Sequence, residues 1–181
     1  MKTATENLEN DHVYILTLTE VMQKIALSES PDPAHVESVI TIIKNFADGI
    51  HHAKEENLLF PKLGQKGFSP HQGPVAVMLH EHVEGRNFVK GMSENLELYK
   101  SGKHEAAAGI SVNMEGYASL LQNHIAKENN ILFKMADNVL SADEQSELID
   151  DFERVESNQA DGKKPADFIK SIGELASIYL K

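Results

Sequence analysis

The sequence predicts an all-α fold, an up-down-up-down four-helix bundle with an additional C-terminal helical hairpin. Two observations support this prediction. Apolar residues recur at helical spacing through most of the chain, and no stretch shows the sustained alternation of a strand bounded by turn residues. Four of the helical segments are long and joined by short connections, so consecutive helices are expected to run antiparallel.

Helix boundaries follow from turn and capping residues. Pro33 suits the first turn of the second helix, Gly64 is expected to end it, and Gly102 is expected to end the third helix. We therefore expect the four long helices over residues 7–27, 33–63, 74–100 and 103–139.

The C-terminal part begins with a capping box, in which Ser141 is followed three residues later by Glu144. It predicts a fifth helix over residues 141–157. A polar linker, residues 158–164, follows, and Pro165 can open a sixth helix. We expect residues 1–140 to form the bundle and residues 141–181 to pack on it as helices, not as a separate domain.

The composition excludes several classes of function. The 181-residue chain has no cysteine, which excludes disulfides, thiolate metal sites and cysteine nucleophiles. Its net charge of −11 disfavours nucleic acid and anionic membranes as partners. The polar start and the lack of a long apolar run predict a cytoplasmic protein.

The most informative pattern is a His-x-x-x-Glu pair that occurs on two of the long helices. His51 precedes Glu55 on the second helix, and His124 precedes Glu128 on the fourth. Residues four apart lie on the same helix face, so each pair can offer an imidazole and a carboxylate to one metal centre. Two such pairs on facing helices form the kind of site that bundles use for two iron or manganese ions.

The second helix also contains an overlapping pair, His52 and Glu56. Comparison of the two motif copies favours His51 and Glu55, because a Phe follows Glu55 and Glu128 at the same distance. His52 would be out of step by one residue. We expect His52 to lie at the surface or outside the ligand set, and Glu56 to be a solvated charge.

The other two long helices each carry one histidine on the apolar face, His12 and His82, whereas His80 faces the opposite side. Taken alone, each is more often a buried, hydrogen-bonded histidine than a ligand. All these residues fall toward one end of an antiparallel bundle, which favours a shared metal site. The predicted metal ligands are His12, His51, Glu55, His82, His124 and Glu128, with Glu81 as a further candidate or an outer contact. No role is assigned to His35, His71 or His104.

These segments resemble the hemerythrin-like, HHE cation-binding family. The resemblance is carried by residues 51–61, 81–86 and 124–133, with His12 upstream. It implies a non-haem di-iron centre with an oxo or hydroxo bridge, the four histidines as terminal ligands, and Glu55 and Glu128 as bridges. Manganese and zinc also suit imidazole and carboxylate ligands.

The chain departs from oxygen-carrying hemerythrins at one place. Those proteins have a second histidine four residues from the one on the third helix, and here Met78 and Arg86 hold the two such positions around His82. Four His and two Glu resemble the hemerythrin-like proteins tied to nitric-oxide stress and iron–sulfur repair. The resemblance implies a protein that binds or reacts with O2, NO or peroxide. A di-iron oxidoreductase, an iron donor in oxidative or nitrosative damage repair, and a metal store or sensor remain alternatives. A redox partner protein and the oligomeric state stay open.

Tyr117 lies about two turns from His124 on the same helix face. Two interpretations stay open. It is either a proton or electron donor outside the ligand set, or a core tyrosine whose hydroxyl is satisfied by the protein.

Overall fold

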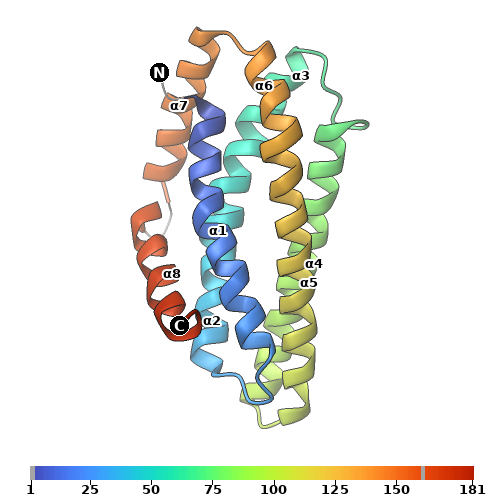
Figure 1. Cartoon of the computed structure of the whole chain (residues 1–181), viewed down its shortest axis with the longest axis vertical. Coiled ribbons are helices and arrows are strands. Elements are labelled where there is room, and N and C mark those ends of the chain that lie inside the picture. The colour runs from blue at the N-terminus through green and yellow to red at the C-terminus, as the bar shows by residue number, and fades with distance from the viewer. Residues whose placement is uncertain (1–2, 160–161) are drawn as a thin grey trace.

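The computed structural model describes residues 3–159 and 162–181, and within these ranges every regular element is helical. Four long helical segments form the predicted bundle (Figure 1). They are α1 (Ala4–Ala26); α2 (Pro33–Ile42), η1 (Ile43–His52), η2 (Glu55–Leu59) and α3 (Phe60–Gln65); α4 (Pro74–Lys100); and η3 (His104–Ala106), α5 (Ala107–Lys127), η4 (Glu128–Leu132) and α6 (Phe133–Val139).

Capping explains where the helices begin and end. Helix α1 begins earlier than expected because Thr3 and Glu6 form a capping box. The second segment continues past Gly64, and the chain turns instead at Gly67, whose φ is 96°. Gly102 has a φ of 94° and follows α4 as expected, since glycine adopts this conformation without steric cost.

The C-terminal helices α7 (Ala142–Ser157) and α8 (Pro165–Tyr179) lie along the outside of α1, one toward each end of the bundle (Figure 1). They follow one another along α1 and do not pack side by side, so they are not the helical hairpin that we expected. The expected capping box of Ser141 and Glu144 starts α7. Phe152 of α7 and Phe168 of α8 are both buried against the bundle. The polar linker lies between them, and its residues 160–161 are outside the described part of the chain.

Three stretches of the bundle, η1, η2 and η4, are π-helical rather than α-helical. They carry His51, Glu55 and Glu128. A π-turn closes its hydrogen bond over five residues instead of four and is found frequently at functional sites. Gly49 suits this geometry, because a Cβ atom there would lie 3.0 Å from the Lys44 carbonyl oxygen, five residues earlier.

The apolar core is divided into two clusters. The smaller one includes Leu8, Leu59, Met78 and Leu132, and the larger one includes Ile15, Ile50, Val89 and Leu121. On each long helical segment, the predicted ligands fall between a residue of one cluster and a residue of the other. A polar layer therefore crosses the bundle between the two apolar clusters. No helix among the described residues has both the length and the apolar character needed to span a bilayer.

Candidate metal centre

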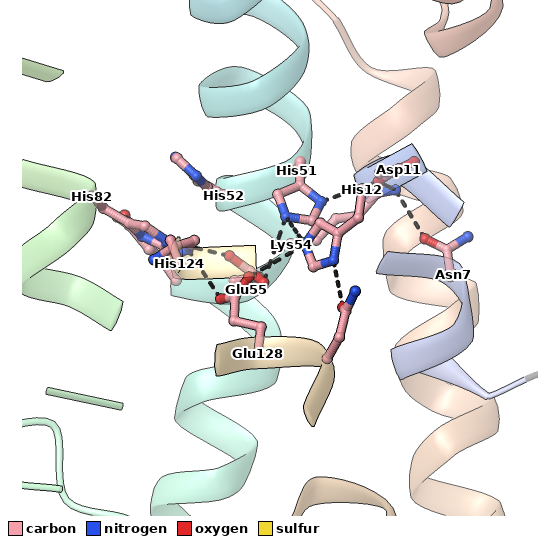
Figure 2. A network of polar contacts seen from close by, with 12 residues as sticks. Asn7, Asp11, His12, His51, His52, Lys54, Glu55, His82, His124 and Glu128 are labelled. Atoms are coloured by element: carbon pink, nitrogen blue, oxygen red, sulfur yellow. Dashed lines mark hydrogen bonds and ion pairs between the residues drawn. The ribbon is translucent and has the colours of Figure 1, made fainter. Parts of the chain in front are cut away.

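The polar layer is built around two pairs of histidines whose ring nitrogens face each other (Figure 2). Nε2 of His12 on α1 lies 3.0 Å from Nε2 of His51 on η1. Nε2 of His82 on α4 lies 3.2 Å from Nε2 of His124 on α5. All four side chains are buried, so the pairs are closed off from bulk water.

Two buried glutamates join these histidine pairs. Glu55 Oε1 lies 3.6 Å from His51 Nε2, and Glu55 Oε2 lies 3.4 Å from His82 Nε2. Glu128 Oε2 lies 3.2 Å from His12 Nε2, and Glu128 Oε1 lies 3.2 Å from His124 Nε2. Each carboxylate thus directs one oxygen to each half of the centre.

The donor atoms form two groups, each with its atoms within 4.8 Å of one another. One group is His12, His51, Glu55 and Glu128, and the other is His52, Glu55, His82 and His124. Glu55 belongs to both. The structure therefore brings the six predicted residues together and adds His52.

The placement of His52 corrects the expectation that it lies at the surface or outside the ligand set. Its residue is only 5% exposed, and its ring stacks on that of His82 with centroids 3.8 Å apart. On a regular α-helix successive residues are rotated by about 100°, so we expected only one of His51 and His52 to face the centre. The π-helical turn of η1 lets both side chains enter the core.

Each of the five histidines has an oxygen on its Nδ1. The distances run from 2.7 to 3.3 Å, and the acceptors are Asn129 for His12, Asp11 for His51, Asp48 for His52, Glu56 for His82 and Glu81 for His124. These carboxylate and amide oxygens only accept hydrogen bonds, so each Nδ1 carries a proton, and a neutral ring then has its Nε2 lone pair free for a metal. Such outer contacts fix the tautomer and orientation of metal-binding imidazoles.

Each of the four carboxylates that contact the histidines forms an ion pair with a basic side chain. Lys54 lies 2.9 Å from Asp11, Arg86 contacts both Asp48 and Glu56 at 2.7 Å, and Lys127 contacts Glu81. The neutral Asn129 needs no such partner. Three cations thus pair with these four carboxylates, so most of the outer negative charge is compensated locally, whereas no lysine or arginine of the described residues pairs with Glu55 or Glu128.

Burial and these contacts set the protonation of the centre. Burial lowers the pKa of His51 to about 4, so its ring is neutral near pH 7. Burial and the neighbouring Glu128 raise the pKa of Glu55 well above its ordinary value. Burial also opposes ionisation of Glu128, but in the metal-free chain His124 and His12 outweigh it where their Nε2 atoms are protonated, and they hold the Glu128 pKa well below its ordinary value.

These features are what a metal site requires. In the described part of the chain, the buried side-chain atoms without a hydrogen-bond partner are the carboxylate oxygens of Glu55 and Glu128. Facing Nε2 lone pairs and unpaired buried carboxylates are both unfavourable unless a cation lies among them. The residues present therefore fit metal ions with nitrogen and oxygen ligands.

The remaining expectations have mixed outcomes. His80 is exposed, as expected. Glu81 lies outside both donor groups and contacts His124 through the ring nitrogen that faces away from the centre. Glu56 is not the solvated charge that we expected, because it accepts hydrogen bonds from His82 and Arg86. Tyr117 is buried beside His52, and its hydroxyl makes no hydrogen bond to the described residues, so it is not satisfied by the protein.

The residues that surround the ligands were not predicted from the sequence. They are Asp11, Asp48, Lys54, Arg86 and Asn129. Two signals were available in the sequence: Asp11 directly precedes His12, and Asn129 directly follows Glu128. Lys54 has no such signal, because a lysine next to a glutamate on a helix reads as an exposed residue.

A four-helix bundle with a paired histidine and glutamate centre defines a class of metal-binding helical proteins. The chain belongs to one family of that class. Residues 3–136 match the Hemerythrin HHE cation binding domain, which covers the four bundle segments.

The chain is also similar to several curated proteins. An uncharacterized protein of Mycobacterium bovis is 27% identical over 94% of this chain and 71% of its own length. Iron-sulfur cluster repair protein YtfE of Pectobacterium carotovorum is 26% identical over 67% of this chain and 56% of its own length. The same repair protein of Escherichia coli O157:H7 is 34% identical over 48% of this chain and 40% of its own length. No solved structure gives a significant match.

Proposed function

We propose that this protein is a non-haem di-iron protein that binds or reacts with O2, NO or peroxide. The observation that carries the proposal is the pair of donor groups joined by two glutamates. His12 and His51 would bind one ion, and His52, His82 and His124 the other. Glu55 and Glu128 would bridge the two, since each directs one oxygen to each histidine pair.

An iron pair held in such a site supplies one-electron changes at two neighbouring ions, as the reduction of O2, NO or peroxide requires. The protein's own contribution is to orient and to exclude water. The ring of Phe133 stacks on His12 with centroids 5.5 Å apart and covers one side of the centre. The outer carboxylates hold each imidazole in one tautomer, and their cations prevent additional negative charge from accumulating.

The two ions would have different numbers of histidine ligands, and this difference favours the binding of an external molecule at one of them. With both glutamates as bridges, the His12 and His51 half has two imidazoles, and the other half has three. The half with fewer protein ligands keeps more coordination positions for an incoming molecule. We infer that small oxidants would bind on the His12 and His51 side.

A second candidate function is donation of iron in damage repair. The match to iron–sulfur cluster repair proteins favours it, although the chain spans only about half of the Pectobacterium relative. A donor must release its metal to a partner, whereas a sensor or enzyme must retain it. The two roles can therefore be separated by measuring iron retention.

The first experiment is metal content per chain after expression with iron, together with optical spectra before and after reduction. Two irons per chain, with near-ultraviolet bands that bleach on reduction, are expected. His51→Ala should lose metal, while the matched control His71→Ala, which changes an exposed loop histidine, should retain it. One metal or none, unchanged in His51→Ala, would contradict the proposal.

A second measurement separates the roles. Addition of O2, NO or peroxide to the reduced protein, with and without excess reductant, distinguishes reversible binding from turnover. Transfer of iron to a metal-free iron–sulfur protein, followed by its cluster absorption, tests donation. Retention of both irons throughout, with no transfer, would exclude the donor role.

A further inference from the structure

A cavity of about 280 Å³ lies beside the candidate metal centre, between η1, α4 and α5. Its walls include the apolar residues Ile43 and Val89, the backbone of Gly85, and the side chains of His52 and Tyr117. A water molecule accounts for about 30 Å³ of liquid volume, so the cavity has room for roughly nine non-hydrogen atoms. That is far more than O2 or NO needs.

Tyr117 provides the first sign of a ligand. The residue is only 2% exposed, yet its hydroxyl makes no hydrogen bond to any described residue. Burial raises the pKa of Tyr117, so the phenol stays a neutral donor. Its oxygen is not among the fully buried atoms that lack a partner, so the hydroxyl opens into the cavity and is available to an acceptor there. An acceptor inside the cavity would satisfy this hydroxyl.

The charges of the cavity wall give the second sign. Lys44, Arg86 and Lys90 line it, against Asp48 and Glu94, in a protein whose net charge is −11. Arg86 is held by Asp48, and Lys90 lies 3.8 Å from Glu94.

Lys44 differs from the other two cations of the wall. No carboxylate of the described residues lies within ion-pair distance of its ammonium group, so this charge is free to meet an anion.

We propose that this cavity binds a small organic anion with an apolar body, of the short-chain monocarboxylate class. The carboxylate accepts the hydrogen bond of Tyr117 and lies in the positive field of Lys44. The carbon chain packs on Ile43, Gly85 and Val89. Binding follows from the cavity alone, whereas its role rests on the proposed function: an occupant beside His52 would close that half of the centre and leave the His12 and His51 half to the small oxidant.

The test uses hexanoate, which has eight non-hydrogen atoms, about the capacity of the cavity. Titration calorimetry is done on the full chain, both metal-free and iron-loaded, with hexanol and acetate as probes that lack the charge or the apolar body. Saturable hexanoate binding to both forms, with acetate and hexanol at least about tenfold weaker, is expected. Absence of saturable binding to the metal-free protein would overturn the proposal.

Variants locate the binding. Gly85→Leu should weaken hexanoate about tenfold or more by filling the cavity. Gly85→Ala is its control, because an added Cβ meets the Tyr117 ring at an ordinary 3.5 Å. Tyr117→Phe removes only the hydroxyl and should weaken binding about fivefold. Tyr117→Phe therefore still tests the cavity if the Gly85→Leu variant fails to fold.

The charge is tested separately. Lys44→Met should weaken hexanoate about threefold, the size of one exposed ion pair, and leave hexanol unchanged. Lys24→Met is the matched control, because Lys24 is exposed and lies outside the cavity wall. Equal affinities in Gly85→Leu, Tyr117→Phe and the natural protein would overturn the assignment. Metal content is measured independently, so failure here is distinguishable from failure of the proposed iron site.

Discussion

The ammonium group of Lys54 is fully buried and lies 2.5 Å from the carboxylate of Glu156 on α7. The same ammonium group contacts Asp11, which accepts the hydrogen bond of His51 Nδ1. Helix α7 is therefore connected to the candidate metal centre by one continuous chain of ion pairs and hydrogen bonds. Four predictions follow from this arrangement and from the geometry of the centre.

Lys54→Met should destabilise the protein by about 3–5 kcal/mol, because removing one partner of a buried ion pair leaves Asp11 and Glu156 uncompensated. The measurement is urea unfolding followed by circular dichroism. Lys62→Met is the matched control, since Lys62 forms an ion pair with the exposed Glu147 and should cost less than about 1 kcal/mol. Equal losses in the two variants would show that the buried network is not stabilising.

His52→Ala should weaken metal binding although His52 lies outside the double motif. Its ring lies in the donor group of His82 and His124, so the loss removes one nitrogen ligand from that half. We expect an affinity loss of at least about tenfold, measured by competition with a coloured chelator. His80→Ala changes an exposed neighbour on the third segment and should bind metal normally. Unchanged affinity in His52→Ala would exclude it from the ligand set.

Glu55→Gln should have opposite effects on the metal-free and metal-loaded forms. The Glu55 pKa is raised by burial and by Glu128, so at neutral pH the folded chain must take up a proton that the unfolded chain does not carry. Glutamine removes this cost, and the Tm of the metal-free protein should rise by about 2–4 °C. Metal affinity should fall, because a bridging carboxylate is lost. The control is Glu84→Gln, an exposed residue. A lower Tm in both forms of Glu55→Gln would contradict this account.

The metal-free protein should lose stability as the pH falls from about 6.5 to 4, the interval between the unfolded and folded pKa values of His51. In this interval the unfolded chain binds a proton that folded His51 does not, so stability rises with pH. Burial lowers the His52 pKa in the same direction. The check is the pH dependence of the unfolding free energy, in which His51→Gln should reduce the slope. An identical slope in that variant would assign the acid sensitivity to other groups.

The bundle and its ligand helices were predictable because each rests on local rules. Capping residues such as Ser141 and helix stops such as Gly102 act within one turn, and the apolar stripes continue over many turns. The comparison of His51 with His124 also worked, because both motif copies have the same spacing to a phenylalanine.

His52 and Lys54 could not be predicted for a common reason. Both enter the core because the second segment is π-helical at and around their positions, and this changes which faces successive residues present. A sequence pattern evaluated at a fixed α-helical rotation places them outside. Arg86 could not be predicted for another reason. Its partners Asp48 and Glu56 lie on another helical segment, so these ion pairs depend on how the two segments pack.

The polar layer that divides the apolar core also determines where the molecule can open. The end that carries α3 and α6 is held by the smaller apolar cluster, and the opposite end, covered by α8, is held by the larger one. Ions in the layer would cross-link these two cooperative units. Without them, hydrogen exchange should accelerate first at the α3 and α6 end. Metal-free molecules would then be open to proteases at one end, so that the supply of the metal would set the lifetime of the protein.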